Sequence, residues 1–394
     1  MHDVLDTPGR KSHLIGDIEV LRAIAVLVTV FQHQSVLTFH RIEAIDAYFD
    51  FWFGVDIFFV VSGFVIVRSL LPTLAMAKNR QDYWRNIVAF WIRRMWRIWP
   101  TAWLWMALVV IAAVFARTQA WGKPLSDLQD AVAILLHVFN LHRADGDAIQ
   151  GVSILSPYWS LSLEEQFYLL LPFLLFIVPR ERLISVLALL IGAQLFLTRW
   201  ALNTNWSGFL WSIRSDGLML GALIALTLEK RWIRNLLEPL FLAKSRTAKC
   251  LSVILPLFLM SALSAGHVVT FGTGLIAILS GWLVWVASYD MNYLIAEGWL
   301  KRILVWIGLR SYAIYVIHCP AFLMTLSIWA HLSPAGTNLG DGQHLWQLSI
   351  TAAVLIVVLS ELNFRLVEVP LRRKGAAIAK RFSQEPRLQL AAVQ

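Results

Sequence analysis

Long apolar segments divide the chain at short intervals. Each is about as long as the 20 residues that a helix needs to cross a bilayer. They lie at 17–40, 50–71, 97–116, 158–178, 183–200, 208–228, 250–266, 268–288, 303–328 and 345–367. No repeat, low-complexity tract or separate soluble domain interrupts them. The pattern predicts an all-α, polytopic membrane protein with ten transmembrane helices.

Two further helices are predicted outside these ten spans. Residues 128–139 are apolar but too few to cross a bilayer, so we expect a short re-entrant or interfacial helix. Residues 76–95 carry apolar side chains at helical spacing, with arginines off that stripe, which predicts a basic amphipathic helix on the cytoplasmic surface. The apolar positions are Trp84, Ile87, Trp91 and Met95.

The lysines and arginines predict the orientation. If both termini are cytoplasmic and 128–139 does not cross, 24 Lys and Arg lie in cytoplasmic segments and 5 lie outside; if it crosses, the counts become 10 and 19. The positive-inside rule favours the first topology. We therefore expect cytoplasmic tails at 1–16 and 375–394 around a single membrane domain, 17–374. The five outer residues are Arg41, Arg117, Lys123, Arg143 and Arg199.

Composition agrees with this class of protein. Of the 394 residues, 58% are hydrophobic and only 15% are charged, whereas a soluble domain has about 25% charged residues. The net charge of +9 comes from clusters between the spans, so we expect contacts with membrane lipids and no nucleic acid. Cys250 and Cys319 lie in apolar segments and predict no disulfide framework. The first apolar run continues too far for a signal peptide, so we expect it to be retained.

Arg22 and His33 are costly residues for a membrane span. Eleven residues apart, they share one helix face and lie about 16 Å apart along the axis. Ionisable groups at membrane depth are rare and usually functional. The residues therefore predict a functional track along the first helix.

Other spans place ionisable groups at one depth, in the outer third of the membrane. Because lipid would not tolerate them, we expect them to face a shared, hydrated interior. They are Asp56, Glu164, Glu165, Arg214, Asp216 and His318. Structural alternatives remain: His318 as an inter-helix hydrogen bond, Arg214 and Asp216 as a structural pair, and the arginines at 93, 94 and 97 as topological anchors.

Together these groups describe a route through the membrane for an anionic ligand. Basic residues stand at the predicted inner mouth, Arg22 lies a little way in, and His33 lies further out with the carboxylates. Histidine can accept a proton from a hydroxyl at working pH. A neighbouring carboxylate would fix its tautomer and stabilise the imidazolium.

The motifs, taken in order, resemble the membrane acyltransferase-3 family of bacterial O-acyltransferases over about residues 17 to 374. The most distinctive block is WSLSLEEQFY at 159–168. The others are Arg22 with His33, GVDIFFVVSG at 54–63, RRMWRIWP at 93–100, RSDGLMLGALIA at 214–225, SYAIYVIHCP at 311–320 and EVPLR at 368–372. The family's usual pair of histidines ending the first helix is here FQHQ, with His33 alone.

The resemblance implies an O-acetyltransferase of the bacterial plasma (inner) membrane. It would move an acyl group, most often acetyl, from cytoplasmic acyl-CoA to an extracytoplasmic glycan such as an exopolysaccharide or a lipid-linked sugar. Acetyl-CoA is the expected donor, and no metal is expected. His33 would be the general base, oriented by Glu164 or Asp56. Donor binding would fall to Arg22, Arg93, Arg94 and Arg97, with support from Ser62, Arg214, Asp216, Tyr312 and His318.

A proton-coupled membrane transporter or exporter is the alternative. It would also need intramembrane His, Asp and Glu residues. Transporters commonly show matching motifs in two halves of the chain, and the polar motifs here all differ from one another. The sequence therefore favours the enzyme.

Overall fold

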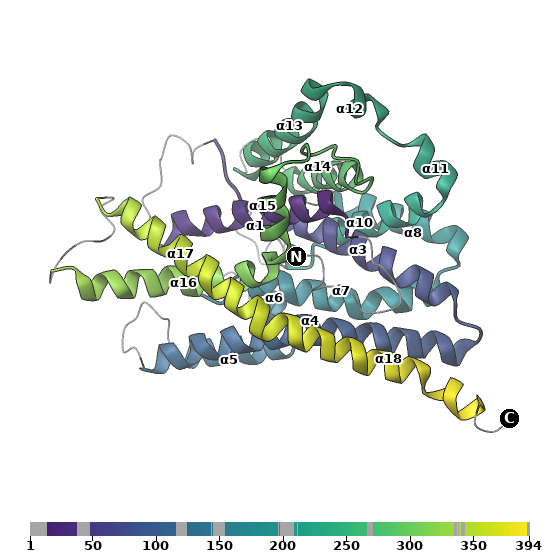
Figure 1. The fold of residues 1–394 in the computed structure, drawn as a ribbon, viewed down its shortest axis with the longest axis horizontal. Coiled ribbons are helices and arrows are strands. Elements are labelled where there is room, and N and C mark those ends of the chain that lie inside the picture. The colour runs from purple at the N-terminus through teal and green to yellow at the C-terminus, as the bar shows by residue number, and fades with distance from the viewer. Residues whose placement is uncertain are drawn as a thin grey trace.

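The structure is a computed structural model, and every element that it describes is helical. It describes residues 14–37, 48–115, 124–142, 154–195, 212–265, 271–334 and 343–391, with single positions at 144, 197, 209, 210, 337 and 339. The expected N-terminal tail, 1–16, lies outside these ranges except for its last three residues. The all-α prediction is confirmed for the described residues (Figure 1).

Six helices are long and apolar enough to cross a membrane. They are α3 (Gly54–Ala75), α4 (Arg80–Phe115), α7 (Tyr158–Ile177), α13 (Arg246–Ser264), α16 (Ser311–Leu332) and the continuous helix Leu345–Ser383. Each overlaps one of the ten predicted spans, which supports a multi-pass membrane protein. The other four spans hold α1 (Gly16–Leu37), α8 (Arg180–Leu195), α10 (Asp216–Glu229) and α14 (Gly272–Ala287). Ten crossings therefore remain a prediction.

Helix α4 joins two elements that the sequence separates. The expected surface helix at 76–95 and the span at 97–116 form one helix of 36 residues, which continues through Pro100. Contacts from distant segments hold its first half in the bundle. The Trp91 indole donates to the Tyr168 carbonyl at 3.0 Å, and α18 (Val369–Ala391) runs beside α4 with Gly375 against the Trp96 side chain (Figure 1). The first half of α4 is therefore a packed part of the fold.

The segment around 128–139 forms two short helices, α5 (Pro124–Leu135) and α6 (Phe139–His142). Twelve residues extend about 18 Å, which is less than the roughly 30 Å hydrocarbon core. Its length agrees with the predicted short, non-crossing helix. The turn between α5 and α6 is tied to α7, because Gln166 donates to the His137 carbonyl at 2.8 Å and to Asn140 Oδ1 at 2.8 Å.

Glycines let two pairs of helices approach closely. A Cβ atom on Gly63 of α3 would collide with the Leu218 carbonyl of α10, and one on Gly221 would collide with the Val60 carbonyl of α3. Gly308 of α15 (Trp299–Leu309) lies equally close to the Glu19 carbonyl of α1. Small residues at such crossings allow backbone contact between membrane helices. These contacts join α3 to α10 and α1 to α15.

The last third of the chain departs from the predicted spans in two places. The ninth span, 303–328, is broken at Arg310 into α15 and α16. After α17 (Leu345–Asn363), the five-residue π-helix η3 (Phe364–Glu368) leads directly into α18. Residues 375–391, expected as a tail, continue that helix. Between α10 and α13, α11 (Arg231–Leu236) and α12 (Leu240–Lys244) form an arm at the upper right of Figure 1.

Candidate active site

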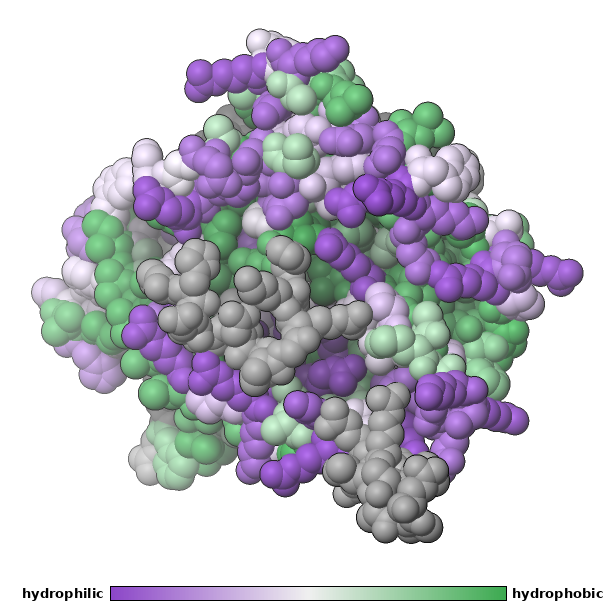
Figure 2. All heavy atoms as spheres, turned by 45° about the vertical axis from the view of Figure 1, so that its right-hand side comes forward, coloured by the Kyte–Doolittle hydropathy of each residue, from purple (hydrophilic) through white to green (hydrophobic). Residues whose placement is uncertain are grey.

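A cavity lies among α1, α3, α4, α7 and α16, and it gathers most of the predicted donor-binding residues. Its empty volume is about 730 Å³, counting the open mouth. Its polar lining consists of Arg22, Ser62, Arg94, Arg97, Ser160, Glu164, Tyr168, Ser311, Tyr312 and Tyr315. Three guanidinium groups therefore face one space that holds a single carboxylate. Figure 2 shows many hydrophilic residues on the side of the molecule that includes the right-hand end of Figure 1.

Helical spacing explains which arginines of α4 reach the cavity. Arg94 and Arg97 are three residues apart and share a face, whereas Arg93 is turned about 100° away. Arg93 is exposed and does not line the cavity. The Arg94 guanidinium lies over the Tyr168 ring, 5.6 Å from its centroid. Neither Arg94 nor Arg97 forms an ion pair with a described carboxylate, so both retain donors for an anionic ligand.

Glu164 belongs to this cavity. The Tyr168 hydroxyl donates to Glu164 Oε2 at 2.6 Å and lies 3.1 Å from Ser62 Oγ. These three residues come from α7 and α3 and form a polar wall of the cavity, and Arg94 lies against it. His33, by contrast, has no hydrogen bond to Glu164 or Asp56 among the described residues. The structure therefore gives His33 a different partner from the carboxylate that the sequence suggests.

That partner is His318, from α16. His318 Nε2 lies 3.1 Å from His33 Nδ1, and the ring centroids are 4.9 Å apart. His318 Nδ1 lies 2.6 Å from the Tyr315 carbonyl oxygen, and His33 Nδ1 lies 3.0 Å from the Thr29 carbonyl oxygen. His318 is fully buried, whereas His33 is partly exposed. Only His33 is therefore accessible to a substrate.

The carbonyl partners determine where the ring protons lie. A backbone carbonyl only accepts hydrogen bonds, so His318 Nδ1 carries its proton and Nε2 of the neutral ring is an acceptor. The same reasoning places a proton on His33 Nδ1, which faces both Thr29 and His318 Nε2. His33 Nε2 is then the nitrogen with an available lone pair. The pair is built to present one basic nitrogen, fixed by a hydrogen bond on the other.

Among the described residues, one group has ligand atoms close enough together to hold a metal ion. It consists of His33, His318 and Cys319, whose ligand atoms lie within 4.8 Å of one another. Cys319 Sγ lies 3.4 Å from His318 Nε2. Histidine and cysteine are ligands that suit Zn²⁺. The hydrogen bonds to the Thr29 and Tyr315 carbonyls account for both ring orientations without an ion. We therefore interpret the cluster as a route for protons.

Asp56 and Arg214 meet each other. Arg214 Nη2 lies 3.3 Å from Asp56 Oδ2, and both residues are almost completely buried. The guanidinium also lies 5.0 Å from the ring centroids of both Trp52 and Trp159. Asp216 is buried in the first turn of α10. The ion pair joins α3 to the segment before α10. This contact supports the structural role considered for Arg214, with Asp56 of α3 as a partner.

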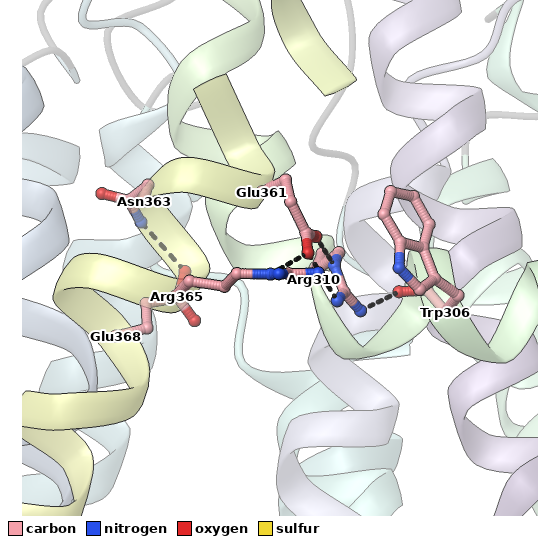
Figure 3. Close-up of polar contacts among 6 residues, drawn as sticks. All are labelled: Trp306, Arg310, Glu361, Asn363, Arg365 and Glu368. Carbon is pink, nitrogen blue, oxygen red and sulfur yellow. Dashed lines mark hydrogen bonds and ion pairs between the residues drawn. The ribbon is translucent and has the colours of Figure 1, made fainter. Parts of the chain in front are cut away.

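Sequence reasoning missed a second group of charged residues (Figure 3). Arg310, at the break between α15 and α16, bonds Glu361 of α17, which also bonds Arg365. The Arg310 guanidinium stacks on Trp306 and Phe364, at 4.2 and 4.5 Å from the ring centroids. An arginine inside the span 303–328 and a glutamate inside 345–367 were the available signals. The rule that intramembrane charges are rare would have found both.

Asn363 joins this group to α4. Its amide nitrogen donates to Thr101 Oγ1 at 3.0 Å and to Glu368 Oε1 at 3.2 Å. Its amide oxygen accepts from the Trp105 indole at 3.2 Å. These contacts fix the π-helical turn against α4, close to Tyr312, whose hydroxyl donates to the Ile98 carbonyl at 2.6 Å. The group thus supports the cavity wall from behind.

Comparison with known sequences decides the family. The sequence model of acyltransferase 3, described as an acyltransferase domain, matches residues 15–360. The chain belongs to this family. The match includes every residue that lines the cavity and both histidines, whereas η3 and α18 follow it. The resemblance seen in the motifs is confirmed.

Three relatives of this acyltransferase-3 chain are named as O-acetyltransferases or as candidates for that activity. Peptidoglycan O-acetyltransferase OatA of Listeria monocytogenes is 28% identical over 384 residues, covering 92% of this chain and 56% of the relative. YrhL of Bacillus subtilis, a candidate peptidoglycan O-acetyltransferase, is 27% identical, covering 92% and 55%. A candidate O-acetyltransferase of Staphylococcus aureus strain COL is 26% identical, covering 94% and 59%. The chain thus spans a little over half the length of these relatives. No solved structure matches it significantly.

Proposed function

We propose that this chain is a membrane O-acyltransferase that moves an acyl group, most often acetyl, from acyl-CoA on the cytoplasmic side to a hydroxyl of an extracytoplasmic glycan. The observation that carries the proposal is the cavity of three arginines beside an oriented histidine pair in an acyltransferase-3 chain. The names of the relatives support a glycan as acceptor. Polysaccharide and lipid-linked sugar are the two forms that such an acceptor takes.

The arginines provide the donor site. Coenzyme A carries several negative charges on its phosphates, and guanidinium groups bind phosphate oxygens with geometry that lysine cannot match. Arg22, Arg94 and Arg97 approach the cavity from two helices and give it a net positive charge. Arg22 is held by Glu19 at 3.5 Å. The phosphates would bind here, with the acyl thioester extending past Ser62 and Tyr315 toward the histidines.

Tyr315 connects the donor site to the base. Its side chain lines the cavity, where its hydroxyl lies 2.7 Å from Ser160 Oγ, and its carbonyl oxygen accepts from His318 Nδ1. A donor in the cavity and the histidine pair are therefore separated by the thickness of one residue. Tyr315 would contact the thioester with its side chain and fix the tautomer of His318 with its carbonyl oxygen.

His33 Nε2 would take the proton of the acceptor hydroxyl as its oxygen attacks the thioester carbonyl. The carbon–sulfur bond breaks, the thiolate of CoA leaves and receives the proton, and the products are the O-acyl glycan and free CoA. During the step His318 Nε2 accepts from His33 Nδ1 and stabilises the imidazolium, the role that a carboxylate plays in other triads. His318 is thus a positioning residue.

The test is transfer across a membrane. The purified chain is reconstituted in liposomes with isotope-labelled acetyl-CoA on one side and glycan fragments on the other. We expect labelled O-acetyl ester on the glycan by mass spectrometry, and only in vesicles that contain the protein. Movement of a solute with no ester formed would favour the transporter. Surface polysaccharides from cells with and without the gene, compared by mass, identify the acceptor and the acyl group.

A further inference from the structure

The arm made of α11 and α12 has the properties of a segment that lies at a membrane surface. Most of its apolar side chains are exposed, with Trp232 66% and Leu236 72% accessible and Leu240 and Phe241 also exposed, whereas Leu242 is buried. Basic residues alternate with them. Exposed aromatic and aliphatic groups beside lysine and arginine are typical of helices at the boundary between headgroups and acyl chains. We infer that the arm rests at the level of the lipid headgroups.

A groove lies beside this arm and is separate from the donor cavity. It has an empty volume of about 700 Å³, counting its open side, and shares no lining residue with that cavity. Its walls come from α3, α10, α11 and the residue after α14. The apolar lining consists of Phe64, Leu71, Pro72, Ala225 and Leu228. Arg68 and Arg234 line it together with Ser288 and Glu229.

The two arginines of the groove are held by aromatic rings. Arg68 lies 5.9 Å from the Phe64 ring centroid, and Arg234 lies 5.6 Å from that of Tyr289. Neither forms an ion pair with a described carboxylate. Glu229, the carboxylate of the groove, is bonded by Arg180. The groove therefore offers two sets of guanidinium donors for an external anion.

Two buried arginines elsewhere in the molecule have structural roles, whereas Arg68 is exposed and Arg234 is half-buried. Arg214 is paired with Asp56, and Arg310 is paired with Glu361. Arg68 and Arg234 lack such a carboxylate and face an apolar groove from two separate elements. Their arrangement matches a ligand that carries both a negative charge and apolar chains.

We propose that this groove binds an anionic phospholipid. The phosphate would lie between Arg68 and Arg234, and an acyl chain would follow Phe64, Leu71 and Leu228. The surface position of the arm places the groove at headgroup depth, which favours a lipid over a soluble phosphate. The charge-based topology puts this end of α3 and α10 on the cytoplasmic side, where anionic lipids are concentrated.

The test is lipid titration of the detergent-purified full chain, followed by native mass spectrometry. The probes are phosphatidylglycerol, phosphatidylcholine and inorganic phosphate. Arg68→Gln with Arg234→Gln is compared with Arg231→Gln with Arg246→Gln, which removes the same charge from exposed positions outside the groove. We expect the first double variant to bind phosphatidylglycerol about tenfold or more weakly. A change of this size corresponds to the loss of at least one charge-assisted hydrogen bond. The control should bind like the parent chain.

Three results would overturn the proposal. They are equal losses in the two double variants, phosphatidylcholine binding as tightly as phosphatidylglycerol, and displacement of the lipid by inorganic phosphate alone. Arg68→Lys with Arg234→Lys keeps the charge and guards against a folding defect. We expect it to bind phosphatidylglycerol between the parent and the glutamine variant, and a complete loss there would also contradict the proposal.

Discussion

The donor cavity and the histidine pair lie side by side and share Tyr315, but one is rich in charge and the other is a chain of hydrogen bonds. The cavity gathers Arg22, Arg94 and Arg97 around a single carboxylate. Arg22 is paired with Glu19, whereas Arg94 and Arg97 form no ion pair with a described carboxylate and remain available for a ligand. The histidines form a neutral chain of hydrogen bonds from the Tyr315 carbonyl oxygen to His33, and no described carboxylate bonds to it. One region is suited to binding and the other to moving a proton.

Because the two regions differ in this way, steady-state kinetics can separate donor binding from proton transfer. Under the proposed function, charge in the cavity stabilises the bound donor before and during reaction, so its loss should raise KM. A base contributes only when the proton moves, so its loss lowers kcat. Variants of the two regions should therefore fall into different kinetic classes.

The sharpest test of the comparison is His33→Gln. Glutamine keeps the size and the hydrogen bonding of the side chain but cannot take a proton at working pH. We expect kcat to fall by about 10² to 10⁴, the usual contribution of a general base, with the donor KM unchanged. Acyl transfer by the purified protein, at unchanged thermal stability, provides the measurement.

His331→Gln is the matched control for this variant. His331 Nδ1 bonds the carbonyl four residues earlier at 2.7 Å, as His33 does, but it is exposed and lies away from His318. It should retain full activity. Substantial activity in His33→Gln itself would remove His33 as the base and leave His318 as the candidate.

Arg94→Gln with Arg97→Gln tests the other region. Two charge-assisted contacts to phosphate are lost, each of roughly 1.5–3 kcal/mol, so the donor KM should rise about a hundredfold or more. The value of kcat at saturating donor should change little. Arg93→Gln is the control, because Arg93 is exposed and lies off the cavity face. If Arg93→Gln raised the KM as much, the arginines would act only through net surface charge.

Arg93 also illustrates how far the sequence could lead. The sequence identified a basic cluster, and helical spacing alone separates Arg93 from Arg94 and Arg97. The assignment to one cavity required α1 and α7, because Arg22 and Glu164 reach it from distant parts of the chain. The all-helical class and most polar positions followed from hydropathy, which is a local property.

Partners across helices were beyond a single sequence. His33 and His318 are 285 residues apart, and no periodicity indicates that their rings meet. Carboxylates seemed the better partners for His33, yet Asp56 is bonded by Arg214 and Glu164 by Tyr168. The packing of α18 against Trp96, which holds the first half of α4 in the bundle, was hidden for the same reason. Long-range packing decided each of these features.

His318→Leu sharpens the role of the hydrogen-bond chain. Without the Nε2 acceptor, the His33 imidazolium loses a hydrogen bond to a charged group, about 1.5–3 kcal/mol, so kcat should fall roughly tenfold to a hundredfold. His318→Gln restores an acceptor near the same point and should recover part of the loss. Nitrogen NMR shifts of labelled histidine should show His33 protonated on Nδ1 in the parent chain. Protonation on Nε2 would contradict the proposed tautomer.

The smallest expected effect comes from Tyr168→Phe, which tests whether the polar wall of the cavity helps to bind the donor. The variant removes the hydroxyl between Glu164 and Ser62. A typical intramolecular hydrogen bond contributes about 0.5–1.5 kcal/mol, so the donor KM should change a few-fold while kcat stays within a factor of about two. Tyr158→Phe removes an equally buried hydroxyl, which bonds the Ala102 carbonyl at 2.8 Å outside the cavity. Tyr158→Phe should lower thermal stability about as much as Tyr168→Phe does, and it should leave the donor KM unchanged. A fall in kcat for Tyr168→Phe as large as that for His318→Leu would mean that the two regions are one catalytic unit.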